Sequence, residues 1–224
     1  MVLKERTVVK KLAEKLANRN QNFARDHDQH LGDILTHVNP AKSPEVDSSL
    51  RNLYGGLVPR LQPEIDLILR KGDDIRAIEV KCFQLRGKNC LNKSYYEGID
   101  QTLALLMYGF DKVALWHVFD ESISVQQFAT SGSTAQLFVR EQLKLPIDYT
   151  ALYMKRNRRD LQFIPTQPRV TGFSSMELVD FKELTTIEDP RFRFTWQSSS
   201  TIMDFPRVRN LRRVLINWLD QRDQ

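Results

Sequence analysis

The stretch that most constrains the fold is residues 62–83, QPEIDLILRKGDDIRAIEVKCF. Two runs rich in Ile, Leu and Val flank the polar break Lys71-Gly72-Asp73-Asp74, a pattern typical of a β-hairpin. If Gly72 and Asp73 form the tip of the turn, Asp66 lies opposite Glu79. Because side chains alternate between the two faces of a strand, one face is predicted to be core and to carry Ile65, Leu67, Leu69, Ile78, Val80 and Cys82.

The other face of the hairpin is apolar near the turn and charged at its open end, where it carries Asp66, Glu79 and Lys81. Carboxylates directly opposite one another are destabilising unless something compensates their charge. Two carboxylates and a backbone carbonyl suit a hard cation such as Mg²⁺. The Lys81 ammonium could orient or help deprotonate an attacking water and offset negative charge on a phosphate. The alternative is an unrelated α/β protein in which these charges form structural ion pairs.

The run Pro63-Glu64-Ile65-Asp66, followed after a gap of twelve residues by Glu79-Val80-Lys81, resembles the PD-(D/E)XK motif of the restriction-endonuclease-like nuclease superfamily. The resemblance implies that Asp66 and Glu79 bind Mg²⁺, for which Mn²⁺ would substitute, and that Lys81 is the catalytic lysine. The chain departs from the motif in one respect, because Pro63 stands three residues ahead of Asp66.

Two flanking helices carry further candidates. Residues 2–19 have a helical period whose apolar stripe includes Glu5, and the resemblance makes Glu5 an additional acid of the site. The alternative is a frayed first turn with Glu5 in solvent. A second helix is expected over 93–108, with Gln101 between apolar neighbours. Some relatives in the superfamily carry a glutamine there, whereas a plain surface amide is the competing interpretation.

The predicted order of elements defines an α/β fold. The first helix is followed by a polar loop over 20–48, a strand over 50–58, the hairpin, the second helix and a strand over 113–119. This order matches the αβββαβ core of the restriction-endonuclease-like superfamily, a central mixed sheet flanked by helices. The pattern beyond it predicts more elements: a strand over 123–128, a helix over 135–143, strands over 152–154 and 161–164, and an amphipathic helix over 206–222.

Proline at 165 and 168 suggests the end of the core, so residues 1–165 are predicted to form the nuclease-like core. Residues 166–224 are then a basic C-terminal extension that ends in the amphipathic helix. Of the net charge of +5, most falls in residues 151–224, with 13 Lys/Arg against 9 Asp/Glu.

Two basic turns are candidate contacts to a phosphate backbone, whose binding depends on positive charge. The first contains Arg86 and Lys88, and the second contains Lys155, Arg156, Arg158 and Arg159. A solvated hairpin tip is the competing interpretation of the second turn.

Together these features predict a Mg²⁺-dependent nuclease that hydrolyses nucleic-acid phosphodiesters, with DNA as the expected substrate. The rival is a non-catalytic nucleic-acid-binding or scaffold protein on the same fold. A homodimer would bring two sites together to cut both strands. The chain contains no run of 18 apolar residues, which predicts no membrane span. The start MVLKERTVVKKL lacks an apolar signal core, which predicts a cytoplasmic protein.

Overall fold

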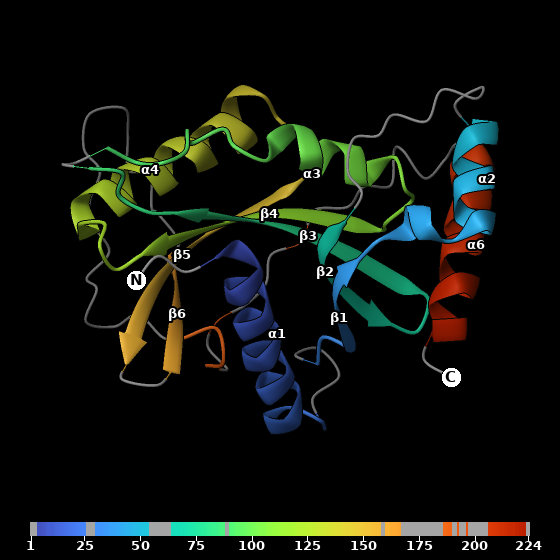
Figure 1. Cartoon of the computed structure of the whole chain (residues 1–224), viewed down its shortest axis with the longest axis horizontal. Helices are drawn as coiled ribbons and strands as arrows, with labels where there is room; N and C mark the ends of the chain where they lie inside the picture. Colours follow the sequence, from blue (N-terminus) through green and yellow to red (C-terminus); the bar gives the residue numbers. More distant parts are fainter. Residues whose placement is uncertain are drawn as a thin grey trace.

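The computed structural model describes residues 4–25, 30–53, 64–87, 90–157, 160–166, 186–189, 192, 196 and 206–222. Figure 1 shows a central, strongly twisted sheet with helices packed around it. The described helices are α1 (Glu5–Asn22), η1 (Pro40–Lys42), α2 (Pro44–Leu53), α3 (Ile99–Leu106), α4 (Val125–Leu137), the π-helical η2 (Phe138–Gln142) and α6 (Pro206–Arg222).

The sheet has six strands in the order in which they occur along the chain. They are β1 (Asp33–Val38), β2 (Ile65–Lys71), β3 (Asp74–Phe83), β4 (Lys112–Asp120), β5 (Asp148–Asn157) and β6 (Asp160–Thr166). The three inner strands β3, β4 and β5 are parallel, whereas the other neighbouring pairs are antiparallel. The sheet is therefore mixed, and a crossover through α3 links β3 to β4, as a parallel pair requires.

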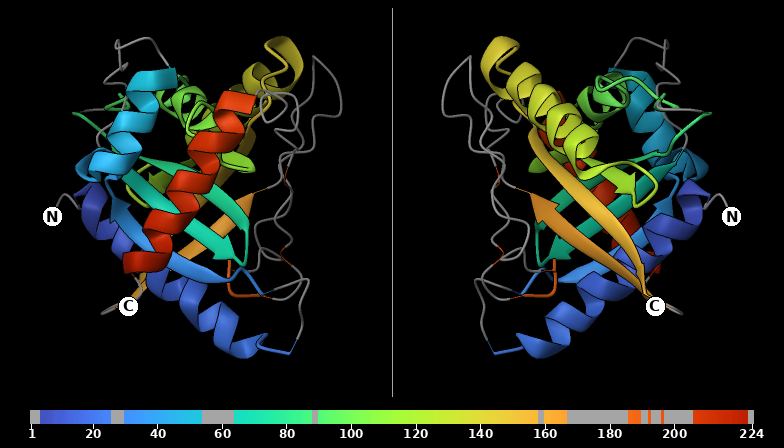
Figure 2. Two further views of the ribbon diagram at one scale, coloured as in Figure 1. Left: turned by 90° about the vertical axis from the view of Figure 1, so that its right-hand side faces the viewer. Right: turned by 90° about the vertical axis from the view of Figure 1, so that its left-hand side faces the viewer.

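Each face of the sheet has its own hydrophobic core. One face packs against α2, α3, α4 and α6, with Ile68, Ala77 and Leu115 among its strand residues. The other face carries Leu67, Ile78 and further residues of the inner strands, which are covered by the apolar stripe of α1. The two views of Figure 2 show α1 on one side of the sheet and α3 and α4 on the other.

The hairpin forms as the sequence predicts. Leu67 pairs with Ile78 and Lys71 with Asp74, which is the predicted register. One residue differs, because Ile65 packs with Val38 on the face opposite Leu67. The adjacent His37 has a φ of +52°, so the regular alternation of β1 ends there, next to Val38, the residue that pairs with Ile65.

Three local predictions were wrong. Residues 33–38, expected in a loop, form the edge strand β1, and 44–53 form α2, so the expected strand over 50–58 is helical as far as residue 53. Residues 54–58 lie outside the described part. The expected strand over 123–128 is the start of α4, whose capping box joins Ser124 and Gln127.

The last helix α6 is part of the main core. Leu211, Leu215 and Leu219 are buried in the same cluster as the strand residues of that face. Figures 1 and 2 show α6 lying beside α2 at one edge of the molecule. The proposed division of the chain at residue 165 stays a prediction. Of the helices that the structure describes, none is long and apolar enough to span a membrane.

Candidate active site

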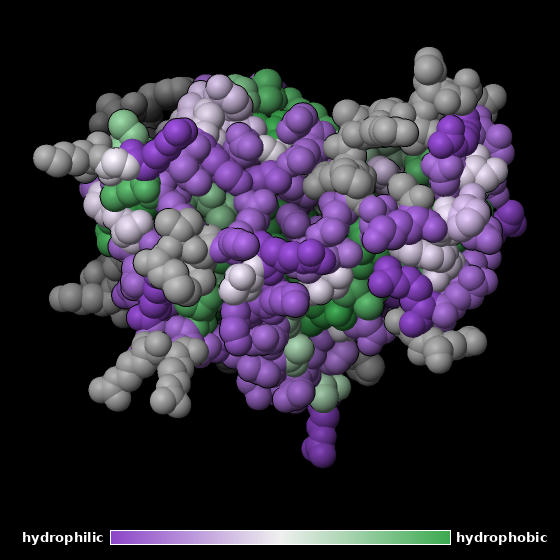
Figure 3. Space-filling view, in the orientation of Figure 1, coloured by the Kyte–Doolittle hydropathy of each residue, from purple (hydrophilic) through white to green (hydrophobic). Residues whose placement is uncertain are grey.

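Four charged side chains from three elements meet at the open end of the β2–β3 hairpin. Asp66 comes from the first residues of β2, Glu79 and Lys81 from β3, and Glu5 is the first residue of α1. Figure 3, in the orientation of Figure 1, shows hydrophilic side chains across the middle of the molecule, over the region between α1 and α3. The structure thus brings Glu5, Asp66, Glu79 and Lys81 into one cluster.

Lys81 and Glu79 form a buried ion pair. The Lys81 Nζ lies 2.5 Å from Glu79 Oε1 and 3.8 Å from Glu5 Oε1. Glu79 is 0% exposed and Lys81 is 7% exposed. Burial alone would lower the pKa of Lys81, but the carboxylates of Glu79, Glu5 and Asp66 outweigh it, so the pKa is raised. Lys81 is therefore held as a cation between carboxylates.

Glu5 is held where α1 begins. Its Oε2 accepts a hydrogen bond from Lys93 Nζ at 2.6 Å and one from the backbone N–H of Cys82 at 3.0 Å. Burial would raise the pKa of Glu5, but these two hydrogen bonds and the charge of Lys81 lower it. Glu5 is thus an ionised acid that tethers α1 to β3 and faces Lys81.

Asp66 lies just beyond Leu67–Ile78, the last backbone pair at the open end of the hairpin, and its side chain accepts a hydrogen bond there. Its Oδ2 accepts a hydrogen bond from the Val80 N–H at 2.8 Å. Burial, together with the nearby carboxylates of Glu5 and Glu64, raises its pKa to about 6 against the opposing effects of the Val80 N–H and Lys81. The cluster thus carries more negative charge than its own cations offset, a feature typical of functional sites.

Gly98 and Gln101, at the start of α3, lie next to Lys81. Both line a pocket that also includes Lys81. Gly98 has a φ of +85°, and a Cβ at this position would lie only 2.9 Å from Lys81 Cγ. The absence of a side chain at residue 98 therefore leaves the room in which the Lys81 stem lies.

His117 forms a hydrogen bond with the turn that precedes α3. It is fully buried on β4, opposite Lys81 in the register. Burial lowers the pKa of His117 to about 3, so the ring is neutral. Its Nε2 lies 2.9 Å from the Glu97 carbonyl, which can only accept, so Nε2 carries the proton and Nδ1 accepts from the Tyr149 hydroxyl at 3.0 Å.

Lys93, Gly98 and His117 were not predicted as site residues. All three act through contacts between segments far apart in the chain, and no spacing in the sequence signals such contacts. The only local hint is the run Tyr95-Tyr96-Glu97-Gly98, in which a glycine directly precedes a helix.

Of the predicted nucleic-acid contacts, the two on β5 lie beyond the level of the cluster. In the sheet register, Lys81 on β3 is level with Ala151 on β5. Lys155 and Arg156 follow Ala151 on β5 by four and five residues. The side chain of Arg156 pairs with Asp120 and with Glu121. Arg86 is exposed just beyond the end of β3. Lys88, Arg158 and Arg159 lie outside the described residues.

The carboxylates of Asp66 and Glu79 are of the ligand type that Mg²⁺ prefers. This ion is usually bound by one or two carboxylates and completes its shell with water and substrate phosphates. Within the described ranges, no three His, Cys, Asp or Glu side chains lie close enough together to hold a metal ion. In the described part of the chain, Asp66 and Glu79 are therefore not part of a closed protein cage for an ion.

Comparison with known proteins leaves the family open. No family model matches the chain, and no curated protein matches it. One similarity to a solved structure was found, "The structure of Pyrococcus Furiosus SfsA in complex with Ca2+", at 13% identity and a TM-score of 0.28. It covers 46% of this chain and 48% of that chain, so the match spans about half of each. A likeness of this size carries no argument about function.

Proposed function

We propose that the protein is a metal-dependent nuclease that hydrolyses nucleic-acid phosphodiesters, with Asp66, Glu79 and Lys81 at its active site. One observation carries the proposal: the acids and the lysine of the PD-(D/E)XK-like motif converge with Glu5 around the buried Glu79–Lys81 pair, in a cluster in which acids outnumber cations. Burying such charge is costly, and a structural role does not require it.

The fold supports the same proposal. A helix, three strands with α2 inserted between the first and second, a crossover helix and a parallel strand follow one another from α1 to β4. This is the order of the αβββαβ core that the motif implies. DNA remains the expected substrate, and the basic side chains of Arg86 and Lys155 are proposed to contact its backbone.

Each residue of the cluster then has a distinct task. Asp66 and Glu79 supply the oxygen donors for the ion, and Lys81 places a fixed positive charge beside them. Glu5 lies 3.8 Å from the Lys81 ammonium, and Gln101 lines the pocket beside Lys81. A bound Mg²⁺ would add Lewis-acid stabilisation of the phosphate and lower the pKa of a water. The ion pairs of Lys81 with Glu79 and Glu5 support a role in orienting water and stabilising charge.

The test is cleavage of supercoiled plasmid, linear duplex and single-stranded DNA with Mg²⁺ or Mn²⁺, beside the Lys81→Ala variant. We expect metal-dependent cleavage that is lost in the variant. Cleavage at the same rate in Lys81→Ala would remove the assignment of this lysine.

Metal binding provides a second readout that does not depend on turnover. We expect Mg²⁺ or Mn²⁺ to raise the melting temperature of the wild-type protein, because a ligand that binds only the folded state stabilises it. Asp66→Ala should abolish this rise. Tight nucleic-acid binding without any cleavage or metal response would instead favour the non-catalytic binding protein.

A further inference from the structure

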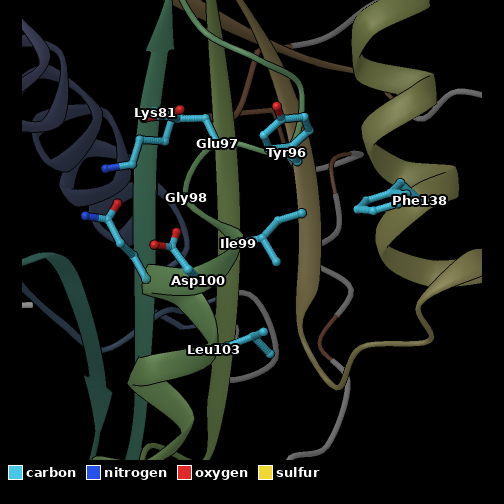
Figure 4. A pocket seen from close by; sticks show the side chains of 9 residues that line it. Lys81, Tyr96, Glu97, Gly98, Ile99, Asp100, Leu103 and Phe138 are labelled. Carbon is cyan, nitrogen blue, oxygen red and sulfur yellow. The ribbon is translucent and has the colours of Figure 1, made fainter. Parts of the chain in front are cut away.

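A pocket of about 650 Å³ opens beside Lys81, at the start of α3. Its volume is within the range of small-ligand sites. Apart from Lys81 and Gln101, its wall includes two aromatic rings, Tyr96 and Phe138, and the aliphatic side chains of Ile99 and Leu103. Figure 4 shows Lys81 at one side of this pocket and Phe138, from a different helix, at the other, pointing toward Tyr96 and Ile99.

The aromatic wall is exposed but ordered by ring contacts. Tyr96 is 57% exposed, and its neighbour Tyr95 is 37% exposed. The Tyr95 ring meets Tyr96 edge to face at 5.4 Å and Phe138 edge to face at 5.9 Å. Clustered aromatic surface of this kind on a solvent-facing wall usually marks a binding site.

The wall of the pocket opposite Lys81 includes a π-helical segment. Phe138 is the first residue of the π-helical segment η2, and such segments are rare and often occur at functional sites. The aromatic part of the wall therefore comes from two separate segments, the turn that carries Tyr96 and the η2 segment that carries Phe138, and the Tyr95 ring contacts both side chains.

The charges at the pocket indicate which part of a nucleic acid would enter it. The carboxylates of Glu97 and Asp100 line it, and carboxylates repel a phosphate. Lys81 lies at one side of the pocket (Figure 4), so a phosphate belongs there. What fits between aromatic rings, beside acceptors for N–H groups, is a planar, uncharged group with apolar faces and polar edges.

We propose that this pocket receives an unpaired nucleobase next to the phosphodiester at the Lys81 cluster, with Tyr96 as its stacking platform. The proposal rests on the proposed nuclease function and narrows its substrate to single-stranded or locally unpaired nucleic acid. A base inside a duplex is stacked and paired, and it can occupy such a pocket only after leaving the stack. Aromatic stacking accepts every base, so the pocket selects for unpaired structure rather than for sequence.

The test measures binding apart from cleavage. Fluorescence anisotropy in EDTA would compare labelled 12-nucleotide strands of DNA and RNA, a DNA duplex, and a DNA strand with abasic residues in place of its central nucleotides. We expect the intact single strand to bind more tightly than the abasic strand. The DNA and RNA arms identify which sugar the site accepts.

Three variants of the full chain assign the effect to the platform. Tyr96→Ala should weaken binding of the intact strand by about tenfold and leave the abasic strand unchanged, in line with the loss of one base–aromatic stack. Tyr96→Phe should bind like wild type, because it keeps the ring. Val125→Ala, at another exposed apolar side chain, is the matched control and should have no effect. Since Tyr96 is exposed, these variants should fold, and thermal melts would verify this.

The outcomes separate this proposal from the nuclease assignment. Equal wild-type affinity for intact and abasic strands, or unchanged binding by Tyr96→Ala, would overturn the base pocket even if the protein cleaves duplex DNA with Mg²⁺. Base-dependent binding that is lost in Tyr96→Ala would support the pocket, even if no substrate were cleaved and the nuclease assignment failed.

Discussion

The two ends of the β2–β3 hairpin handle charge in opposite ways. At the turn end, three acids each face an arginine: Asp74 pairs with Arg76, Asp111 with Arg212, and Asp220 with Arg70. Arg212 and Asp220 come from α6, so these pairs also fasten the last helix to the hairpin. Matched pairs of this kind have an ordinary structural explanation.

At the open end, three acids share two lysines. Lys81 pairs with Glu79 and Glu5, Lys93 pairs with Glu5, and Asp66 lies within the electrostatic reach of Lys81; Glu79 is completely buried. Asp66 also stands out, because burial, with a smaller contribution from nearby carboxylates, raises its pKa to about 6. The same hairpin therefore contains an arrangement that stabilises and one that costs stability. The difference argues against structural ion pairs as the explanation of the motif.

The largest expected contrast is in activity, and one substitution can be made at both ends. Asp66 and Asp111 each accept a hydrogen bond from a β3 backbone N–H, at 2.8 Å in both cases. Asp66→Asn should lower the rate of Mg²⁺-dependent cleavage by at least about a hundredfold, because an amide is a poor ligand for the ion and removes a charge from the site. Initial rates on the preferred substrate would measure this.

Asp111→Asn is the matched control for that experiment. It should cleave within about threefold of the wild-type rate, since the substitution lies at the turn end. A comparable loss in both variants would mean that the substitutions act through general stability, and the contrast between the two ends would disappear.

The next contrast is in stability and has a defined pH dependence. The pKa of Asp66 is about 6 in the folded protein against 3.8 ordinarily. Between these values the folded state binds more protons than the unfolded state, so this group lowers stability as the pH rises through the window. Asp66→Asn should therefore increase the free energy of unfolding by about 2 kcal/mol at pH 8, a value reduced for partial exposure, and by almost nothing below pH 4.

Asp111→Asn should do the reverse, because it weakens the ion pair with Arg212. A loss of about 1 kcal/mol at pH 8 is expected. Urea denaturation of both variants and wild type at pH 4 and pH 8, without divalent metal, would measure the difference. Destabilisation by Asp66→Asn at pH 8 would show that Asp66 is a structural acid after all.

The sequence predicts the hairpin because period-2 alternation around Gly72 is a local property. It misses β1 because Asp33–Val38 is a short edge strand within a polar stretch, and only its pairing with β2 makes it a strand. The start of α4 could have been found, since Ser124 and Gln127 have the spacing of a capping box.

The site divides in the same way. Asp66, Glu79 and Lys81 could be predicted because hairpin register places them together. Glu5 depended on the resemblance, because nothing in its own helix indicates where α1 docks. Lys93, Gly98 and His117 reach the cluster through tertiary contacts among α1, β4 and the turn before α3. Such contacts follow from the packing of the whole fold and leave no local pattern.

Two glycines extend the comparison to a smaller effect. Gly72 at the turn end has a φ of +60°, and a Cβ added there would meet no atom of the described residues within 4 Å. Gly98 at the open end has a φ of +85°, and a Cβ there would lie 2.9 Å from Lys81 Cγ and 3.0 Å from Leu115 Cδ1. Gly72→Ala should cost about 1 kcal/mol for the left-handed backbone alone. Gly98→Ala should cost about 1 kcal/mol more, because the Lys81 stem must move.

The added cost at residue 98 should be accompanied by a loss of cleavage, since the displaced stem carries the ammonium away from Glu79. A decrease of about tenfold is expected for Gly98→Ala and none for Gly72→Ala. Chemical denaturation and cleavage rates of the two variants would be measured side by side. Equal stability and full activity in both variants would show that the turn before α3 can shift to accommodate the added Cβ at little cost. Lys81 would then be positioned by its ion pairs alone.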